Sequence, residues 1–340
     1  MARRFIDWRQ IGTIEAGMRH FLRRIGLAAA VLSTSLAAAQ PQPQSQAQPQ
    51  PQTQGGLVEV PVRSAAQPVA GTAAPVRPAM WLVRDADTTI YLFGTIHALP
   101  PGIDWFGGNV ASAFDGSQEL VTEIVETDPA QMQNAVLGKA VLPPDKSLRT
   151  MLTPPQRAAY EQALTTYGLP AASFDRLKPW YVAVFLSALP VLRDGYATEH
   201  GVEKLLETRA KAKARPHTGL ETAEYQLGLF DSLPMAVQLR YLNEVVAELP
   251  TATNELGAMV EAWKRGDADT LARLMNEEES APELMELLLV NRNKAWAEWI
   301  DKRLDAPGTV FMAVGAGHLA GNGSVQQQLA AKGIAAARVQ

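Results

Sequence analysis

The sequence predicts an α+β (α/β) fold in which a central mixed sheet is assembled from the two ends of the folded part of the chain. Residues 88–101 read TTIYLFGTIHALPP and residues 309–319 read TVFMAVGAGHL, so an apolar strand runs into a Gly-x-x-His turn in both segments. Between them the sequence changes to long helical patterns, which predict a large helical insertion over about residues 153–305. Strands at both ends with helices between them pair most simply in one sheet.

The first 39 residues have the layout of a secretory signal peptide. A cluster of arginines precedes an apolar segment at residues 25–39 that ends in small residues, so we expect cleavage after residue 39. Met18 is an alternative start, because a signal peptide beginning there has an ordinary length. The segment is short beside the roughly 20 residues of a membrane span, so membrane attachment is expected only if it stays uncleaved. The protein is therefore expected to be exported, either to the periplasm or out of the cell.

Residues 40–78 form a tract rich in glutamine and proline, beginning QPQPQSQAQPQPQTQ. Such a tract cannot bury enough apolar surface to offset the entropy lost on ordering. We therefore expect a disordered linker there, and a folded domain over residues 79–340.

Composition excludes several classes of function. The 340 residues include no cysteine, which rules out thiolate nucleophiles, cysteine-based metal sites and a lipidated cysteine anchor. The formal net charge is −4, and the predicted signal peptide carries more basic than acidic residues, so the remaining chain is more acidic still. An acidic exported protein is a poor candidate for binding nucleic acid or an anionic membrane surface.

The elements before the helical region are predicted from turn residues and apolar runs. Residues 80–94 (MWLVRDADTTIYLFG) predict two strands joined by a tight Asp-Ala-Asp-Thr turn, which is typical of a hairpin. Further along we expect a short helix at residues 108–114, a strand at residues 119–125 (ELVTEIV) and a loop at residues 142–152.

The middle of the chain is predicted to be almost wholly helical. Residues 153–169 open with a threonine N-cap followed by prolines and close near Gly168, which indicates a helix. Residues 178–192 are strongly apolar but too short for a comfortable membrane span, so we expect a buried helix. The remaining expected elements are a helix at 201–215, a short strand at 217–220, helices through 222–300, a strand at 309–314, a helix at 323–332 and a last strand at 334–339.

Two histidines are the first candidates for chemistry. His97 and His318 each follow an apolar strand and lie three residues after a glycine, Gly94 or Gly315. Either histidine alone would be explained as a hydrogen-bonded side chain at the edge of a sheet. Because imidazole is the commonest metal ligand and a frequent general base near neutral pH, the matched placement predicts one shared functional site.

Three further side chains are candidates, each with a plainer alternative. Glu123 lies within the apolar run VTEIV, where a carboxylate is costly to bury unless it is paired or bound to a metal; it could instead point to solvent. Glu221, in HTGLET, is either a further oxygen ligand or an acid favoured by the dipole of the following helix. Arg292 lies near Trp296 and is either a holder of anionic substrate groups or a surface arginine that covers an aromatic stripe.

Two histidines with one or two carboxylates and no cysteine suit a tetrahedral or octahedral metal site with open positions. Zn²⁺, Mn²⁺, Co²⁺ and Fe²⁺ all fit such a ligand set. The sequence has no His-Glu-x-x-His helix, no Gly-x-Ser-x-Gly elbow and no phosphate-binding loop. The GAGHLAGNG segment lacks the register of a dinucleotide-binding turn, so a nucleotide cofactor is not expected.

Five segments taken in order resemble the landmarks of the TraB/PrgY/GumN family, which is related to the Tiki metalloproteases. They are YLFGTIHALPPG, ELVTEI, GLETAEYQL, NRNKAW and VFMAVGAGHLAGNGS, and the resemblance covers about residues 80–340. It implies a metal-dependent hydrolase fold with a site formed by His97, His318 and Glu123. The chain departs from the pattern at Asn291, where many relatives have a glutamate, and this departure puts full activity in doubt if that glutamate helps to hold the site.

The sequence and the resemblance together lead us to expect an exported metal-dependent hydrolase that acts on a peptide or protein substrate. The metal would be held by His97, His318 and Glu123 and would activate a bound water. Glu123 or Glu221 would accept the proton, and Arg292 would steady the substrate or the developing charge. The alternative is a non-catalytic binding module that sequesters a peptide or a haem-like ligand between the same histidines.

Overall fold

The computed structural model describes residues 75–125, 128–276 and 282–340. The predicted signal peptide and residues 40–74 of the predicted linker lie outside the described residues. The core of the described part is a six-stranded mixed sheet with the order β4-β3-β5-β2-β1-β6. Its strands are β1 (Met80–Arg84), β2 (Thr88–Thr95), β3 (Glu119–Thr122), β4 (His217–Gly219), β5 (Gly308–Gly315) and β6 (Ala337–Arg338).

The two strands that lead into the Gly-x-x-His turns lie side by side at the centre of the sheet. β2 and β5 are parallel and are paired over their whole length, from Thr88 opposite Gly308 to Thr95 opposite Gly315. β3 runs parallel to β5 on its other side, and β4 runs parallel to β3. β1 forms the predicted hairpin with β2 and also pairs with β6. The predicted mixed sheet, built from both ends of the domain, is confirmed.

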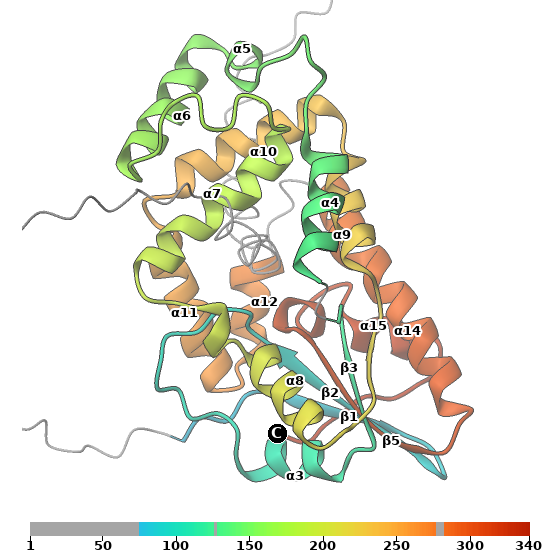
Figure 1. The fold of residues 1–340 in the computed structure, drawn as a ribbon. Coiled ribbons are helices and arrows are strands. Elements are labelled where there is room, and N and C mark those ends of the chain that lie inside the picture. The colour runs from blue at the N-terminus through green and yellow to red at the C-terminus, as the bar shows by residue number, and fades with distance from the viewer. Residues whose placement is uncertain (1–74, 126–127, 277–281) are drawn as a thin grey trace, which may run out of the picture.

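Helices cover both faces of this sheet (Figure 1). Successive side chains of a strand point to opposite faces, so Met312 of β5 belongs to one apolar cluster and its neighbour Phe311 to another. The first cluster is closed by α14 and α15, and the second by α3, α8, α11 and α12. These helices are α3 (Gly108–Gly116), α8 (Val202–Ala212), α11 (Ala252–Lys264), α12 (Ala268–Asn276), α14 (Asn291–Leu304) and α15 (Val325–Ala331).

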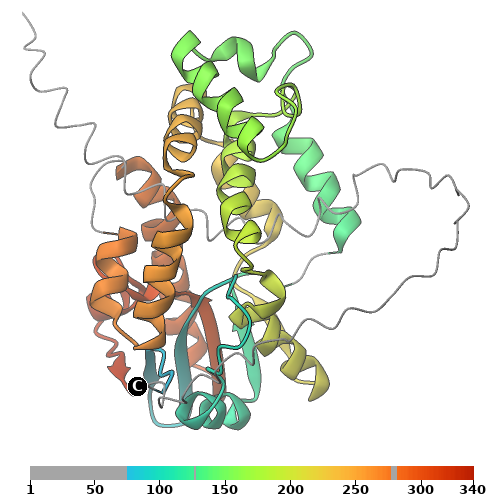
Figure 2. The ribbon, with the colours of Figure 1, turned by 90° about the vertical axis from the view of Figure 1, so that its left-hand side faces the viewer.

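A separate helical layer lies above the sheet in both views (Figures 1 and 2). It has its own apolar core, to which Trp180, Phe230 and Tyr241 contribute stacked rings. The chain passes from the carboxyl ends of β3 and β4 into two of its helices, α4 and α9. The helices of this layer are α4 (Pro129–Ala140), α5 (Leu148–Met151), α6 (Pro154–Thr166), α7 (Pro179–Arg193), α9 (Ala223–Asp231) and α10 (Met235–Glu248).

The apolar helix α7 is buried, as the sequence predicts. Trp180, Val182 and Leu186 are fully enclosed in the core of the helical layer. Within the described ranges, no helix combines the length and the apolar character that crossing a membrane requires.

The structure differs from the sequence prediction at four places. β3 ends at Thr122 rather than at residue 125, because the Thr122 hydroxyl turns to donate to the Ile124 carbonyl, at 2.7 Å. Helix α4 was not predicted, although the Asp128 side chain caps it by accepting from the backbone N–H of Ala130, at 2.9 Å. The predicted loop at residues 142–152 contains the short helix α5, and the last strand is only two residues long.

Candidate active site

Each of the four parallel strands delivers one predicted site residue to the same edge of the sheet. His97 follows the end of β2, Glu123 follows β3, Glu221 follows β4 and His318 follows β5. Since the carboxyl ends of parallel strands share one edge, where α/β proteins commonly bind ligands, the topology brings together residues from distant parts of the chain. Arg292, on α14, reaches the same cluster.

The two motif glycines are needed because the turns approach other groups closely. A Cβ atom on Gly94 would lie 3.1 Å from the Cα of Ala316, which belongs to the other turn. A Cβ atom on Gly315 would lie 3.1 Å from Oε1 of Glu123, and the Gly315 N–H donates to this oxygen at 2.8 Å. Glycine therefore allows the two turns to pack against each other and against Glu123.

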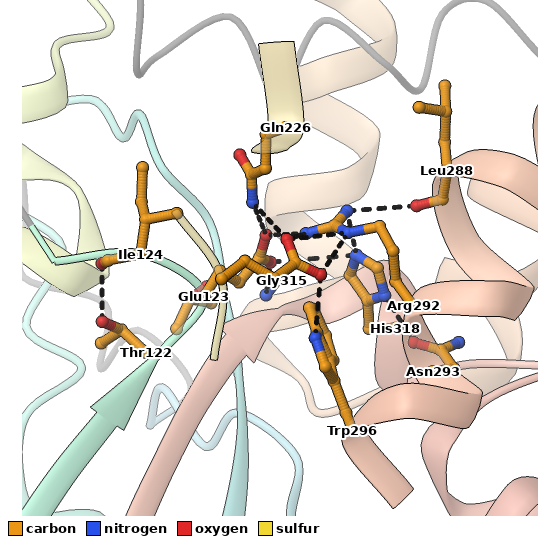
Figure 3. A network of polar contacts seen from close by, with 12 residues as sticks. Thr122, Glu123, Ile124, Gln226, Leu288, Arg292, Asn293, Trp296, Gly315 and His318 are labelled. Carbon is orange, nitrogen blue, oxygen red and sulfur yellow. Dashed lines mark hydrogen bonds and ion pairs between the residues drawn. The ribbon is translucent and has the colours of Figure 1, made fainter. Parts of the chain in front are cut away.

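Arg292 is the centre of the polar network in Figure 3. Its Nη2 donates to Oε2 of Glu123 at 2.6 Å, and its Nε donates to Oε1 of Glu221 at 2.9 Å. The three side chains are only 9%, 12% and 6% exposed, respectively. The alternative of a surface arginine is therefore wrong, and so is the alternative of a Glu123 that points freely into solvent.

Two residues that sequence reasoning missed complete the contacts of Glu221. Trp296 Nε1 donates to its Oε1 at 2.9 Å, and Gln226 Nε2 donates to its Oε2 at 2.9 Å. Gln226 also donates to Oε2 of Glu123, at 3.2 Å. A sequence signal existed for Trp296, because it lies four residues after Arg292 and so shares its helix face.

The backbone before α14 is irregular where it supports Arg292. Residues Glu286–Val290 form a π-helix, and the N–H of Asn291 donates to the carbonyl of Glu286, five residues earlier. Arg292 Nη1 donates to the carbonyl of Leu288 at 3.1 Å. Such π-turns occur often at functional sites. Asn291, where the sequence resemblance led us to expect a glutamate, is exposed to solvent.

His318 is held as a neutral imidazole. Its Nδ1 lies 2.6 Å from Oδ1 of Asn293, whose amide is oriented by donating from Nδ2 to the carbonyl of Gly323 at 2.8 Å. Nδ1 therefore carries the proton, and Nε2 accepts from Arg292 Nη1 at 3.1 Å. Burial and the positive charge of Arg292 lower the pKa of His318 to about 3.

His97 lies at the same edge but has the opposite electrostatic environment. Its Nδ1 is 2.7 Å from Oε1 of Glu203, and the Thr95 hydroxyl donates to the same oxygen. Burial alone would lower the pKa of His97, but the carboxylates of Glu203 and Glu123 outweigh burial and raise it to about 9. Sequence reasoning missed Glu203, because an acidic residue in the first turn of a helix is common and is explained by its favourable interaction with the helix dipole.

The Glu123–Arg292 pair stays ionised. Burial would raise the pKa of Glu123, but Arg292 and the two histidines hold it far below its usual range. Burial likewise opposes the charge on Arg292, but Glu123 and Glu221 raise its pKa well above the usual value.

The donor set fits a divalent cation in its chemistry and charge. Both imidazoles have Nδ1 fixed by a side-chain oxygen, the arrangement that orients Nε2 of metal-binding histidines. Two carboxylates (Glu123 and Glu221) pair with the guanidinium of Arg292 and a third, that of Glu203, contacts His97, so with neutral imidazoles these groups carry two uncompensated negative charges. Among the described residues, no group of three or more His, Asp or Glu side chains is already arranged to hold a metal ion, so the metal ligands stay a prediction.

Comparisons with known proteins agree on one family. The model of the TraB/PrgY/gumN family matches residues 79–338. The uncharacterized protein YbaP of Escherichia coli (strain K12) is 24% identical over 256 residues, which cover 74% of this chain and 92% of that protein, and YbaP of Shigella flexneri gives the same values. An uncharacterized protein of Treponema pallidum (strain Nichols) is 22% identical over 260 residues, which cover 72% of this chain and 78% of that protein. No solved structure matches. From the match to residues 79–338 we conclude that the chain belongs to the TraB/PrgY/gumN family.

Proposed function

We propose that this protein is an exported metal-dependent hydrolase that acts on peptide bonds in a peptide or protein. The observation that carries the proposal is the delivery of His97, Glu123, Glu221 and His318 to one edge of the sheet by four parallel strands. Export rests on the arginine-led apolar segment within residues 1–39.

The residues that would hold a divalent cation are His97, His318 and Glu123. A bound cation of this kind supplies a Lewis acid and a water whose pKa is lowered toward about 7. His318 suits the ligand role because it is neutral and its Nε2 lone pair points into the cluster. Glu123 suits it because the carboxylate stays ionised and its Oε1 lies 3.8 Å from that same nitrogen.

Arg292 would stabilise negative charge that develops on the substrate. Its guanidinium is buried, is fixed by Glu123 and Glu221, and reaches the Nε2 side of His318. Fixed donors aimed at a developing oxyanion are usually worth several kcal/mol in a site that excludes water. The proton released by the attacking water would pass to Glu123 or Glu221, which are both within the same network.

The test is to purify the full chain, measure its metal content, and assay a peptide library with and without a chelator. We expect chelator-sensitive hydrolysis that falls at least about 100-fold in His97→Ala and in His318→Ala, since each removes a metal ligand. His200→Ala is the matched control, because His200 is exposed and is not part of the cluster. Glu221→Gln and Glu123→Gln then separate the two proton acceptors.

Hydrolysis that survives both histidine substitutions would overturn the proposal. Tight binding of a peptide or of haem without any turnover, lost in the same two variants, would instead support the alternative of a sequestering module. An absorbance band on adding haem gives the second measurement.

A further inference from the structure

We infer that Glu203, on α8, is the positioning residue of His97. The inference concerns the same site as the proposed hydrolase and depends on that proposal for its consequences in catalysis. Glu203 Oε1 lies 2.7 Å from Nδ1 of His97 and also accepts from the Thr95 hydroxyl, so one carboxylate oxygen ties α8 to two residues of the first turn.

The docking of α8 on this turn is built into the backbone. Val202 N donates to the carbonyl of Ile96 at 3.1 Å, which fixes the start of the helix against the residue before His97. A Cβ atom on Gly201 would lie only 2.1 Å from the carbonyl oxygen of His97, so no other residue fits there without moving the helix. The start of the helix that carries Glu203 is therefore held against the main chain of Ile96 and His97.

The contact with Glu203 selects which nitrogen of His97 faces the rest of the site. A carboxylate only accepts hydrogen bonds, so Nδ1 of His97 must carry a proton. Nε2 is then the nitrogen left for the site, and within the described part of the chain it has no hydrogen-bond partner. Carboxylates that hold the far nitrogen of a histidine in this way fix its ring orientation and raise its basicity as a ligand.

A purely structural role explains Glu203 less well. An acid in the first turn of a helix interacts favourably with the dipole while it stays in solvent, but Glu203 is turned inward to Thr95 and His97. Its second oxygen, Oε2, is buried and has no hydrogen-bond partner among the residues that the structure describes, which costs free energy that a neutral side chain would not incur. The charge is thus directed at His97 at some cost in stability.

The experiment uses the full chain, labelled with ¹⁵N and kept metal-free with a chelator. Long-range ¹H–¹⁵N spectra identify the nitrogen of His97 that carries a proton, in the wild type and in Glu203→Leu. The spectra are recorded above the His97 pKa of about 9, where the imidazole is neutral. There we expect a hydrogen-bonded proton on Nδ1 in the wild type and an exchange between the two tautomers in Glu203→Leu. A His97 signal that is the same in both proteins would overturn the inference.

Zn²⁺ binding and turnover give independent measurements. We expect Glu203→Gln, which keeps the shape but removes the charge, to weaken Zn²⁺ binding measured by calorimetry by about 10- to 100-fold and to lower kcat by a similar factor. Glu199→Gln is the matched control, because Glu199 is an exposed acid one turn earlier. Unchanged Zn²⁺ affinity in Glu203→Gln would also overturn the inference. A changed His97 signal in a protein that hydrolyses no peptide would support the role of Glu203 and contradict the proposed function.

Discussion

The two Gly-x-x-His turns share one sequence pattern and one position but differ in charge. Each follows a central parallel strand, and each histidine has its Nδ1 held by a side-chain oxygen. For His97 that oxygen belongs to the carboxylate of Glu203, and for His318 it belongs to the neutral amide of Asn293. At His97 the carboxylates of Glu203 and Glu123 outweigh burial and raise the pKa to about 9, whereas burial and the positive charge of Arg292 lower the pKa of His318 to about 3.

This difference shows that the Gly-x-x-His motif determines where each histidine lies, whereas side chains from helices elsewhere in the chain determine the charge around it. The paired strands bring the two turns to one edge of the sheet, where Gly94 allows close approach to Ala316 of the other turn and Gly315 allows close approach to Glu123. The partners come from α8 for the first turn and from α14 for the second. α14 also brings Arg292 against Nε2 of His318, whereas His97 has no such cation in the described part of the chain.

Replacing Arg292, the positively charged side chain beside the second turn, is expected to have the largest effect on stability. Arg292→Leu leaves Glu123 and Glu221 buried without their counter-charge, and breaking a buried ion pair in this way costs about 3–5 kcal/mol of unfolding free energy. The measurement is urea unfolding of the variant beside the wild type. Arg292→Leu should also raise the pKa of His318, because the positive charge that lowers it is gone.

Lys294→Ala is the control for Arg292→Leu. Lys294 lies two residues further along the same helix and pairs with Glu286 on the surface, where both side chains are about half-exposed. Its loss should change the unfolding free energy by at most about 1 kcal/mol. Equal destabilisation by the two substitutions would show that the loss of unfolding free energy does not come from the burial of the ion pairs of Arg292.

The pH dependence of stability should show the two turns acting in opposite directions in the metal-free protein. The folded-state pKa of His97 is raised from 6.5 to about 9, so its contribution is complete below pH 6.5 and is lost as the pH rises through 9. The folded-state pKa of His318 is lowered from 6.5 to about 3, so its contribution is complete above pH 6.5 and is lost as the pH falls toward 3.

Each limb of the pH profile can be assigned by one substitution. His97→Gln should flatten the alkaline decline, which amounts to roughly 2–3 kcal/mol for a shift of this size, and His318→Gln should flatten the acid limb. Urea unfolding from pH 4 to pH 9.5 in the presence of a chelator measures both. If His97→Gln changes the acid limb instead, the opposite charges assigned to the two turns are wrong.

Placing a carboxylate at Nδ1 of His318, as Glu203 does at His97, should reduce the difference between the pKa values of the two histidines. Asn293→Asp places a carboxylate against Nδ1 of His318, so the pKa of His318 should rise from about 3 toward its usual range. The substitution also removes the donor to the Gly323 carbonyl, which should cost about 1–3 kcal/mol of stability. Titration of the His318 C2 proton by NMR measures the pKa in the chelated protein.

Asn322→Asp is the matched control for this exchange. It adds the same charge on an exposed loop near His318 without touching Nδ1. A similar rise of the His318 pKa in both variants would mean that general charge, and not the contact at Nδ1, controls the imidazole.

The sequence predicted the positions of the site residues better than it predicted their partners. The apolar strands with their terminal glycines are local signals, and parallel pairing of β2 and β5 then places His97 and His318 at one edge. Glu203 and Gln226 were missed because each lies on a helix whose local pattern looks ordinary, and only tertiary packing turns them inward. Helix α4 was missed for a different reason: Asp128 marks its start, but its apolar pattern is weak.

The smallest effect is expected at Asn291, where the sequence resemblance led us to expect a glutamate. Asn291 is exposed at the start of α14, and its backbone N–H donates to the carbonyl of Glu286, a hydrogen bond that any residue except proline can make. Asn291→Glu, which introduces the glutamate expected from the resemblance, should therefore change the unfolding free energy by less than about 0.5 kcal/mol. Peptide hydrolysis by Asn291→Glu should likewise stay within about twofold of the wild type. A gain in hydrolysis of tenfold or more would contradict this expectation. It would mean that the side chain at position 291 acts on the cluster around Arg292 and His318.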